Sequence, residues 1–256
     1  RHYDFGLRNI LSVLRGSGAA LRKQLAKTGT AVEQKIMATT LKDMNLAKFI
    51  AQDVPLFISL IDDIFPKVSK QIEPADWKDL EIEIQKYLKD MNLSGKEIDW
   101  YTKVIQLHEQ SMVRHGFMLV GSVGTGKTTV MKTLIHSRTQ LKNDYMTMEG
   151  QKTYKTIKMN PKAITASQMF GSLDMVANEW TEGIFAQLWR KANKDKAKFN
   201  WIVLDGPVDA IWIENMNTVM DDNRILTLTT NERIPLTKSM KLLLEISHLR
   251  NASPAT

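Results

Sequence analysis

The sequence predicts an α/β fold with a parallel sheet, preceded by an all-helical segment. The first observation is a set of short apolar runs of strand length, at residues 117–120, 155–159, 201–204 and 241–246. The second is that most of the segment 1–115 has apolar residues at helical spacing. The third is a glycine-rich segment between the first apolar run and a helix candidate at residues 129–138. Strands that alternate with helices in this way form parallel sheets.

The helices expected before the sheet lie at residues 4–27, 31–44, 49–65, 80–91 and 98–115. Gly16-Ser17-Gly18 is expected to interrupt the first helix. Asp53 is a candidate N-cap of the third helix, with Pro55 in its first turn, and Pro66 stops that helix.

Two short strands at residues 225–228 and 232–235 flank Thr230-Asn231, which predicts a hairpin. Residues 141–153 are expected to form a surface loop or hairpin between core elements.

The glycine-rich segment is a complete phosphate-binding loop. Its eight residues read Gly-Ser-Val-Gly-Thr-Gly-Lys-Thr, between an apolar strand and a helix. Backbone N–H groups and the helix dipole favour phosphates there, Lys127 is expected to reach the β- and γ-phosphates, and the Thr128 hydroxyl to hold Mg²⁺. The predicted nucleotide-binding residues are Gly121, Ser122, Val123, Gly124, Thr125, Gly126, Lys127, Thr128 and Thr129. The sequence thus predicts a P-loop fold that binds a nucleoside triphosphate.

A second acidic motif bears on whether the bound nucleotide is hydrolysed. Asp205 ends the apolar strand 201–204 and is expected to hold the Mg²⁺ shell. In most hydrolysing ATPases of the AAA+ class a glutamate that polarises the attacking water comes next, but in this chain the next residue is Gly206. A glycine cannot act as a base, so general-base assistance of about 10²–10⁴-fold is missing. The site is expected to hold ATP more than to consume it, with Asp209 or Glu214 as alternative bases.

A polar group at the end of the strand 241–246 is expected to face the γ-phosphate. The candidates are Glu245, Ser247 and His248. A carboxylate repels a triphosphate, which favours Ser247 or His248.

Composition excludes several classes of protein. No run of eighteen apolar residues predicts a membrane span, and the first residues lack the order of a signal peptide. Without cysteine there is no disulfide framework and no thiolate metal site, which fits a reducing cytosolic compartment. The net charge of +7 permits a nucleic-acid partner, but the densest basic run, residues 190–198, lacks aromatic residues for base stacking. Neither nucleic acid nor a membrane is expected as a partner.

Several segments together resemble dynein heavy chains. Residues 1–8, Arg-His-Tyr-Asp-Phe-Gly-Leu-Arg, resemble the end of the first AAA+ module of that family. The segments that resemble the second AAA+ module are residues 113–116, 121–128, 159–164, 171–174, 179–183, 205–215, 221–223 and 252–256. Among them Asp-Gly-Pro-Val-Asp-Ala-Ile-Trp at residues 205–212 is far more specific than the loop. The details resemble axonemal, outer-arm heavy chains more than the cytoplasmic form.

The resemblance implies a fragment of a large motor. Residues 1–98 are then a helical segment, the small subdomain of the first module with a linker, and residues 99–256 are the large subdomain of the second module, truncated at its C-terminus. In that family the second site binds ATP tightly and hydrolyses it poorly, in agreement with Gly206. Arg8 matches the sensor-II arginine that contacts the nucleotide of the preceding module.

The resemblance also implies partners and a location. The neighbouring AAA+ modules of the same heavy chain adjoin this one, and the full motor binds microtubules and the dynein intermediate and light chains. It works on the cytoskeleton, in the cytoplasm and in the axoneme of cilia and flagella, whose movement it powers.

Two alternatives stay open at this point. One is an active P-loop ATPase, or a kinase, that uses Asp209 as its base. The other is a nucleic-acid-dependent AAA+ protein, suggested by the basic charge and the phosphate-binding loop.

Overall fold

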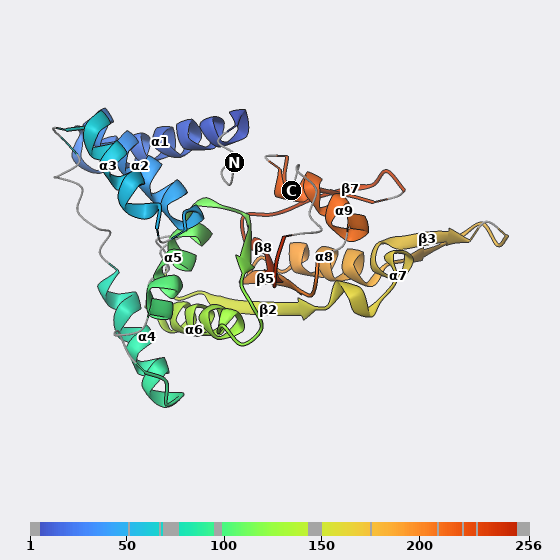
Figure 1. Cartoon of the computed structure of the whole chain (residues 1–256). Helices are drawn as coiled ribbons and strands as arrows, with labels where there is room; N and C mark the ends of the chain where they lie inside the picture. Colours follow the sequence, from blue (N-terminus) through green and yellow to red (C-terminus); the bar gives the residue numbers. More distant parts are fainter. Residues whose placement is uncertain are drawn as a thin grey trace. The chain divides into compact units, whose positions relative to one another are not determined.

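A computed structural model describes the chain at residues 6–50, 52–66, 68, 77–94, 99–142, 150–174, 176–208, 210–221, 223–228 and 230–249. The chain divides into two compact units, residues 1–77 and 78–256 (Figure 1). Residues 78–90 group with the second unit, although the resemblance assigns them to the linking segment.

The first unit is helical, as its apolar spacing predicts. Its elements are α1 (Leu7–Thr28), α2 (Glu33–Asn45), the 3₁₀ turn η1 (Leu46–Lys48) and α3 (Val54–Ile64). The expected interruption of α1 is wrong, because Gly16-Ser17-Gly18 is helical. A Cβ at Gly16 would lie 3.2 Å from both the Met44 sulfur and a Thr40 methyl, so this glycine allows α1 and α2 to approach closely.

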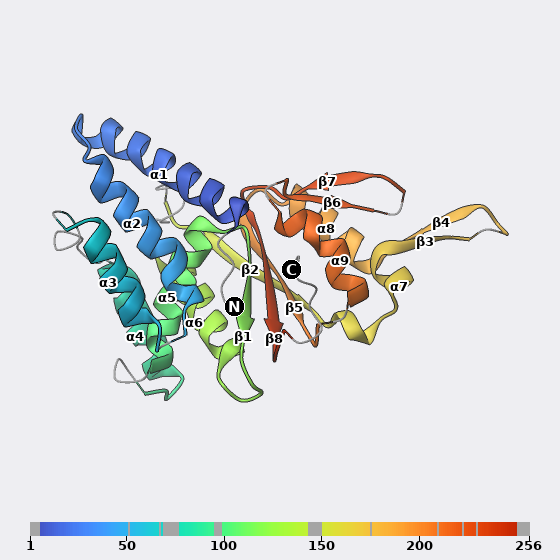
Figure 2. The ribbon, with the colours of Figure 1, turned by 45° about the horizontal axis from the view of Figure 1, so that its top comes forward.

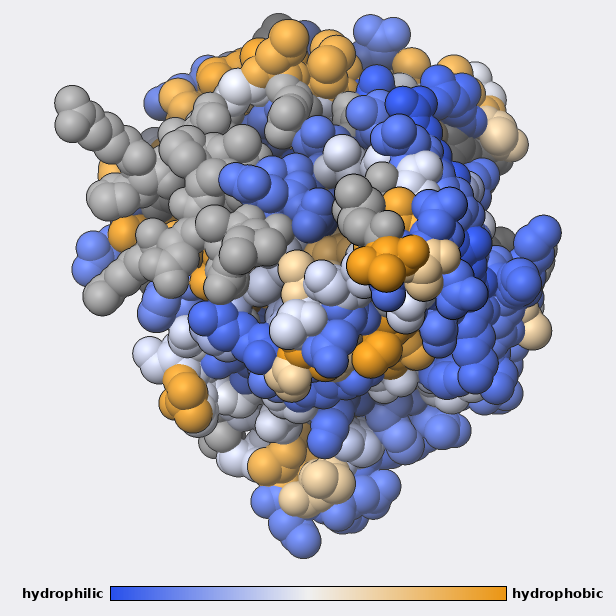
Figure 3. Space-filling view, turned by 90° about the vertical axis from the view of Figure 1, so that its right-hand side faces the viewer, coloured by the Kyte–Doolittle hydropathy of each residue, from blue (hydrophilic) through white to orange (hydrophobic). Residues whose placement is uncertain are grey.

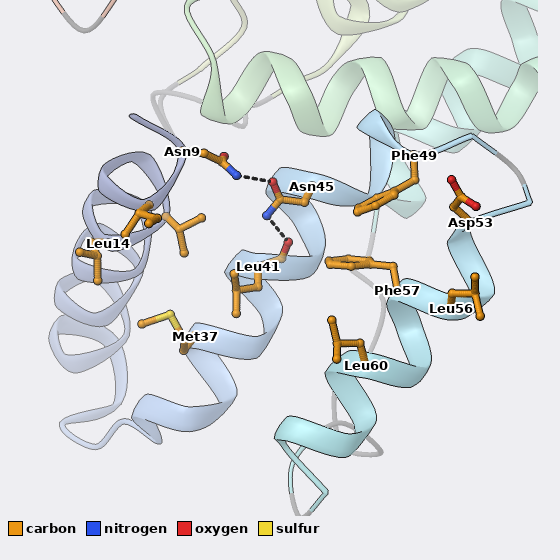
Figure 4. A pocket seen from close by; sticks show the side chains of 12 residues that line it. Asn9, Leu14, Met37, Leu41, Asn45, Phe49, Asp53, Leu56, Phe57 and Leu60 are labelled. Carbon is orange, nitrogen blue, oxygen red and sulfur yellow. Dashed lines mark hydrogen bonds between the residues drawn. The ribbon is translucent and has the colours of Figure 1, made fainter. Parts of the chain in front are cut away.

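The three helices of the first unit enclose an apolar hollow of about 650 Å³ (Figure 4). Phe49 and Phe57 stack there with their ring centroids 4.5 Å apart, and the Asn9 amide donates to the Asn45 side-chain oxygen at 3.2 Å. The lining residues are Asn9, Ile10, Val13, Leu14, Met37, Leu41, Asn45, Phe49, Asp53, Leu56, Phe57 and Leu60. They include no lysine or arginine, so the hollow has no cationic side chain to bind a phosphate.

The second unit is built on a four-stranded sheet in the order β1-β8-β5-β2, with every pair parallel. Its strands are β1 (Gly116–Val120), β2 (Thr153–Met159), β5 (Lys198–Asp205) and β8 (Met240–Ile246). All four strands and the parallel α/β class are as the sequence predicts. The central strands β5 and β8 are buried on both faces, which explains their continuous apolar runs. Strand β2 lies at an edge and carries exposed polar residues.

Helices cover both faces of this sheet (Figure 2). The helices are α4 (Lys78–Asp90), α5 (Asp99–Val113), α6 (Lys127–Gln140), α8 (Ile184–Lys194) and α9 (Ala210–Met220). Trp189 of α8 and Trp212 of α9 belong to one buried cluster with Ile202 and Leu204 of β5. Helices α5 and α6 lie on the opposite side in Figure 2, and α4 packs on α6, where Tyr87 stacks on His136.

Two small antiparallel pairs complete the second unit. The pair β6 (Ile225–Thr227) and β7 (Arg233–Pro235) confirms the predicted hairpin, and Asn231 in its turn has φ +60°. The pair β3 (Gly171–Asp174) and β4 (Glu179–Glu182) extends away from the sheet beside α7 (Ala166–Phe170) in both ribbon views. A 3₁₀ turn, η3 (Pro161–Ala163), follows β2. Most of the loop expected at 141–153 lies outside the described residues.

The surface is largely polar on the face shown in Figure 3, where hydrophobic residues form separate groups among hydrophilic ones. Among the described helices, none combines the length and apolar character needed to cross a bilayer.

Candidate nucleotide site

The phosphate-binding loop occupies the turn between β1 and α6. Strand β1 ends at Val120 and α6 begins at Lys127, so residues 121–126 form the loop itself. Gly124 and Gly126 have φ of +84° and +85°, a left-handed conformation that favours glycine. Left-handed residues in such a loop turn successive backbone N–H groups to one side. These groups form a concavity for an anion, at the positive end of the α6 dipole.

Lys127 and Thr128 are held at the mouth of this loop. The Lys127 ammonium donates to the carbonyl oxygens of Gly121 at 2.6 Å and of Ser122 at 2.8 Å. The Thr125 hydroxyl donates to the Ser122 carbonyl at 2.8 Å, which closes the loop on itself. The side chains predicted to bind phosphate and metal are therefore adjacent at the amino end of α6.

Two carboxylates lie at the same edge of the sheet, where the parallel strands end. Asp205 on β5 and Glu245 on β8 are register partners in a parallel pair, near the carboxyl ends of their strands. Lys158, near the carboxyl end of β2, places its ammonium 2.8 Å from Asp205 Oδ2 and 3.3 Å from Glu245 Oε2. Burial by itself would lower the pKa of Lys158, but the hydrogen bonds and negative charges of Asp205 and Glu245 outweigh it and raise that pKa. The ammonium thus stays charged between the two carboxylates.

Glu245 connects this acidic edge to the phosphate-binding loop. The Thr128 hydroxyl donates to Glu245 Oε2 at 2.8 Å. Glu245 is only 2% exposed, and its other oxygen, Oε1, is buried with no hydrogen-bond partner among the described residues. Thr128 and Asp205, the two residues predicted to share a magnesium ion, are therefore linked through Glu245 and Lys158.

No side chain can stand at position 206 without displacing a neighbour. An added Cβ there would lie 2.7 Å from Asn160 Oδ1 and 3.3 Å from Pro161 Cδ. The same Asn160 oxygen accepts from the Lys162 backbone N–H at 2.9 Å and caps η3, so it is held in place. The space beside Asp205 is taken by this asparagine.

The donor set fits a magnesium nucleotide. Mg²⁺ prefers hard oxygen ligands and is usually bound by one or two carboxylates together with substrate phosphates. The hydroxyl of Thr128 and the carboxylates of Asp205 and Glu245 are ligands of that kind. Within the described part of the chain, no group of three or more His, Cys, Asp or Glu side chains could hold a metal alone.

Most of the predicted site residues lie together in the second unit. Gly121 to Thr129 form the loop and the first turn of α6, and Asp205 lies at the adjoining sheet edge. Arg8 lies on α1 of the first unit, but its side chain is outside the described part, as is all of Asp209. Glu214 is exposed on α9.

Sequence reasoning disfavoured one site residue and missed another. Ser247 and His248 are exposed beyond β8, whereas Glu245 makes the contact with the loop. The repulsion argument against a carboxylate left out Lys158, whose ammonium compensates the charge. A charged residue between the buried Leu244 and Ile246 is a signal that could have identified Glu245, because buried carboxylates are rare unless paired. Lys158 has no comparable signal, since lysine is ordinary on an edge strand.

Comparisons with known proteins agree with this geometry. Residues 1–128 match the family model described as "Hydrolytic ATP binding site of dynein motor region", and residues 116–251 match "AAA domain (dynein-related subfamily)". The chain is 50% identical over 256 residues to dynein axonemal heavy chain 5 of Mus musculus. It is 49% identical over 255 residues to the dynein gamma chain, flagellar outer arm, of Chlamydomonas reinhardtii. In both cases the match takes in 100% of this chain and 5% of the relative's length.

Proposed function

The chain belongs to the dynein heavy chain family, and on that premise we propose that it binds ATP with Mg²⁺ and does not hydrolyse it at an appreciable rate. Residues 121–129 bind the phosphates, Lys127 neutralises their charge, and Thr128 and Asp205 hold the magnesium ion. When bound there, Mg²⁺ would offset the negative charge of the phosphates. The bound nucleotide then acts as a structural and regulatory element of an AAA+ module.

The observation that carries the proposal is the pair formed by Gly206 and Asn160. The position where a hydrolysing relative needs a glutamate has no side chain, and Asn160 Oδ1 lies 2.7 Å from the place that a Cβ at position 206 would take. Loss of a general base costs about 10²–10⁴-fold in rate, and the neighbouring asparagine also fills the space. The family model described as a hydrolytic site matches residues 1–128 only. Its match ends at Thr128 and does not include Asp205 or Gly206.

The rest of the proposal concerns the whole motor, because the chain spans about 5% of the length of its relatives. Residues 1–98 are assigned to the end of the first module and its linker, and residues 99–256 to the second module. Arg8 contacts the nucleotide of the preceding module. The complete heavy chain, of axonemal outer-arm type, binds microtubules and the intermediate and light chains, and moves cilia or flagella.

Neither alternative gains support from the described residues. An active ATPase with Asp209 as its base depends on a residue outside the described part. A nucleic-acid-dependent protein depends on the net charge of +7, and the densest basic run, residues 190–198, contains no aromatic residue.

Equilibrium dialysis of the full chain against labelled ATP with Mg²⁺ tests the proposal. We expect saturable binding of one ATP per chain that excess unlabelled ATP displaces and unlabelled cytidine does not. Absence of saturable ATP binding by a folded chain would overturn the proposed function.

A further inference from the structure

Glu245 contacts the nucleotide site in a way that the usual roles of the phosphate-binding loop and of Asp205 do not explain. Its Oε2 accepts the Thr128 hydroxyl hydrogen at 2.8 Å, while the Lys158 ammonium lies 3.3 Å from the same oxygen. A threonine hydroxyl has one hydrogen and two lone pairs. When the hydrogen is donated to Glu245, the oxygen can offer only lone pairs to any further partner. That is the state in which a hydroxyl binds a cation.

The second oxygen of Glu245 gives an independent indication of a ligand. Oε1 is buried, in a residue only 2% exposed, and has no hydrogen-bond partner in the described part of the chain. A buried carboxylate oxygen without a partner is costly, so native structures retain one where it has a use. A divalent cation, or the water shell of one, would satisfy that oxygen.

Lys158 explains how the acidic edge is stable without such a cation. Its ammonium bridges Asp205 and Glu245, at 2.8 Å and 3.3 Å, and supplies a positive charge to both. A lysine ammonium and a divalent cation then compete for the same pair of carboxylates. The side chain of Lys158 is 40% exposed, so it is free on one side to move toward solvent.

We propose that Glu245 is a metal-positioning residue of the nucleotide site: it orients the Thr128 hydroxyl toward Mg²⁺ and shares the acidic edge with Asp205, while Lys158 is the counter-ion that Mg²⁺ displaces. This inference rests on the proposed function, because the metal enters with the nucleotide. It predicts opposite effects of two substitutions. Loss of the Glu245 charge raises the Mg²⁺ requirement, and loss of the Lys158 charge lowers it.

The experiment measures ATP binding to the full chain as a function of free Mg²⁺, by equilibrium dialysis, in Glu245→Gln, Lys158→Met and wild type. Outer partners of metal ligands typically contribute about 10- to 100-fold in metal affinity. We expect Glu245→Gln to need about 10- to 100-fold more free Mg²⁺ for half-maximal ATP binding. Lys158→Met needs less Mg²⁺ than wild type. Glu179→Gln, at an exposed position on β4, is the matched control and keeps the wild-type requirement.

A double-mutant cycle separates positioning from a merely structural role. If Glu245 acts through the Thr128 hydroxyl, the shift in Mg²⁺ requirement in Glu245→Gln/Thr128→Val is smaller than the sum of the single shifts. The electron paramagnetic resonance signal of free Mn²⁺, titrated with ATP present and compared with ATP alone, gives the bound metal by difference and should follow the same order of variants. If Glu245→Gln does not fold, the lowered requirement of Lys158→Met still tests the inference.

An unchanged Mg²⁺ requirement in folded Glu245→Gln, additive shifts in the cycle, or a raised requirement in Lys158→Met would each overturn the inference while leaving the proposed function intact. If wild type binds no ATP at any Mg²⁺ concentration, the proposed function fails and the inference fails with it.

Discussion

Asp205 on β5 and Glu245 on β8 are register partners, and the Lys158 ammonium on β2 contacts a carboxylate oxygen of each. The three residues come from three neighbouring parallel strands whose carboxyl ends meet at one edge of the sheet, where ligands bind in open α/β folds. Glu245 extends this set to the Thr128 hydroxyl on α6. One edge of the sheet thus joins the phosphate-binding loop to both acidic strand ends.

Removal of the loop lysine is expected to weaken nucleotide binding strongly. Lys127 is held over the loop by two carbonyl oxygens and supplies a positive charge to the phosphates. A hydrogen bond to a charged group contributes about 1.5–3 kcal/mol. Since about 1.4 kcal/mol is tenfold in affinity, Lys127→Ala should bind ATP about 10- to 100-fold more weakly in equilibrium dialysis.

The matched control for that variant is Lys132→Ala, an exposed lysine on the same helix. It removes the same net charge and should leave the affinity for ATP unchanged. Equal losses in the two variants would mean that general electrostatic attraction, and not the loop, holds the nucleotide.

Asn160 and Gly206 should be coupled in stability. The new Cβ of Gly206→Ala would lie 2.7 Å from Asn160 Oδ1 and force that oxygen to move. The hydrogen bond by which Asn160 caps η3 is then lost, which should lower the free energy of unfolding by about 1 kcal/mol. In an Asn160→Ala background the same change should cost little, because the obstructing oxygen is gone. Chemical denaturation of both single variants and the double variant measures the coupling, and simple additivity would contradict it.

The same pair predicts a gain of activity. Gly206→Glu by itself places a base where Asn160 stands, whereas Asn160→Ala/Gly206→Glu gives that carboxylate room. Because a positioned base contributes about 10²–10⁴-fold, the double variant should hydrolyse bound ATP at least about tenfold faster than wild type. Gly206→Gln in the Asn160→Ala background has a side chain of the same shape that cannot act as a base, so its rate of ATP hydrolysis should stay low.

Lys241 is expected to make stability depend on pH. Burial, followed by the charges of Arg138 and Arg224, lowers the pKa of Lys241 to about 7. The unfolded chain holds this proton up to a pKa of about 10.4. Between these values the unfolded state binds more protons than the folded state, so stability rises with pH, by up to about 1.4 kcal/mol per pH unit. Below pH 7 the cost of burying the charge is present in full.

Lys241→Met removes the titrating amine and, with it, the part of the pH dependence of stability that comes from Lys241. It also removes the donor to the Arg114 carbonyl, at 2.7 Å, a loss that does not vary with pH. The stability of the variant relative to wild type should therefore fall as pH rises from 7 to 9. Denaturant unfolding at several pH values measures this difference. A difference that is constant across the range would show that Lys241 does not titrate there.

Two glycines of α1 should respond oppositely to alanine. A Cβ at Gly18 meets only the flexible end of Arg22, at 3.6 Å, so Gly18→Ala should stabilise the first unit by about 0.5–1 kcal/mol through helix propensity. A Cβ at Gly16 lies 3.2 Å from Met44 and Thr40 on α2, so Gly16→Ala should lose that gain. Unfolding followed by helical circular dichroism compares the two. A larger gain at Gly16 than at Gly18 would contradict the close packing of α1 on α2.

Much of this architecture follows from local sequence patterns. The four sheet strands are apolar runs, and the loop between β1 and α6 is a contiguous motif, so both could be predicted. The pair β3 and β4 could not, because Gly-Ser-Leu-Asp and Glu-Trp-Thr-Glu alternate too briefly to give a periodic signal. At Gly16 the helix packs closely against Met44 and Thr40 of α2, a contact that helix propensity does not include.

The acidic edge of the site was the hardest part to predict. Thr128 and Glu245 are 117 positions apart in sequence, and Lys158 and Glu245 are 87 apart, so only strand order and register bring them together. Strand order was not determined by the sequence patterns. Without it, the charge of Glu245 argued against a role beside a triphosphate, because the sequence does not place the Lys158 ammonium next to that carboxylate.

The most direct test of the central claim is a single-turnover experiment on the full chain. Chain in excess of α-labelled ATP and Mg²⁺ is quenched with acid at increasing times, and the labelled nucleotide is separated as ATP or ADP. We expect the bound nucleotide to remain ATP over many minutes in wild type. Rapid conversion of bound ATP to ADP, abolished by Lys127→Ala, would show a working catalytic site and contradict the role of Gly206 in preventing hydrolysis.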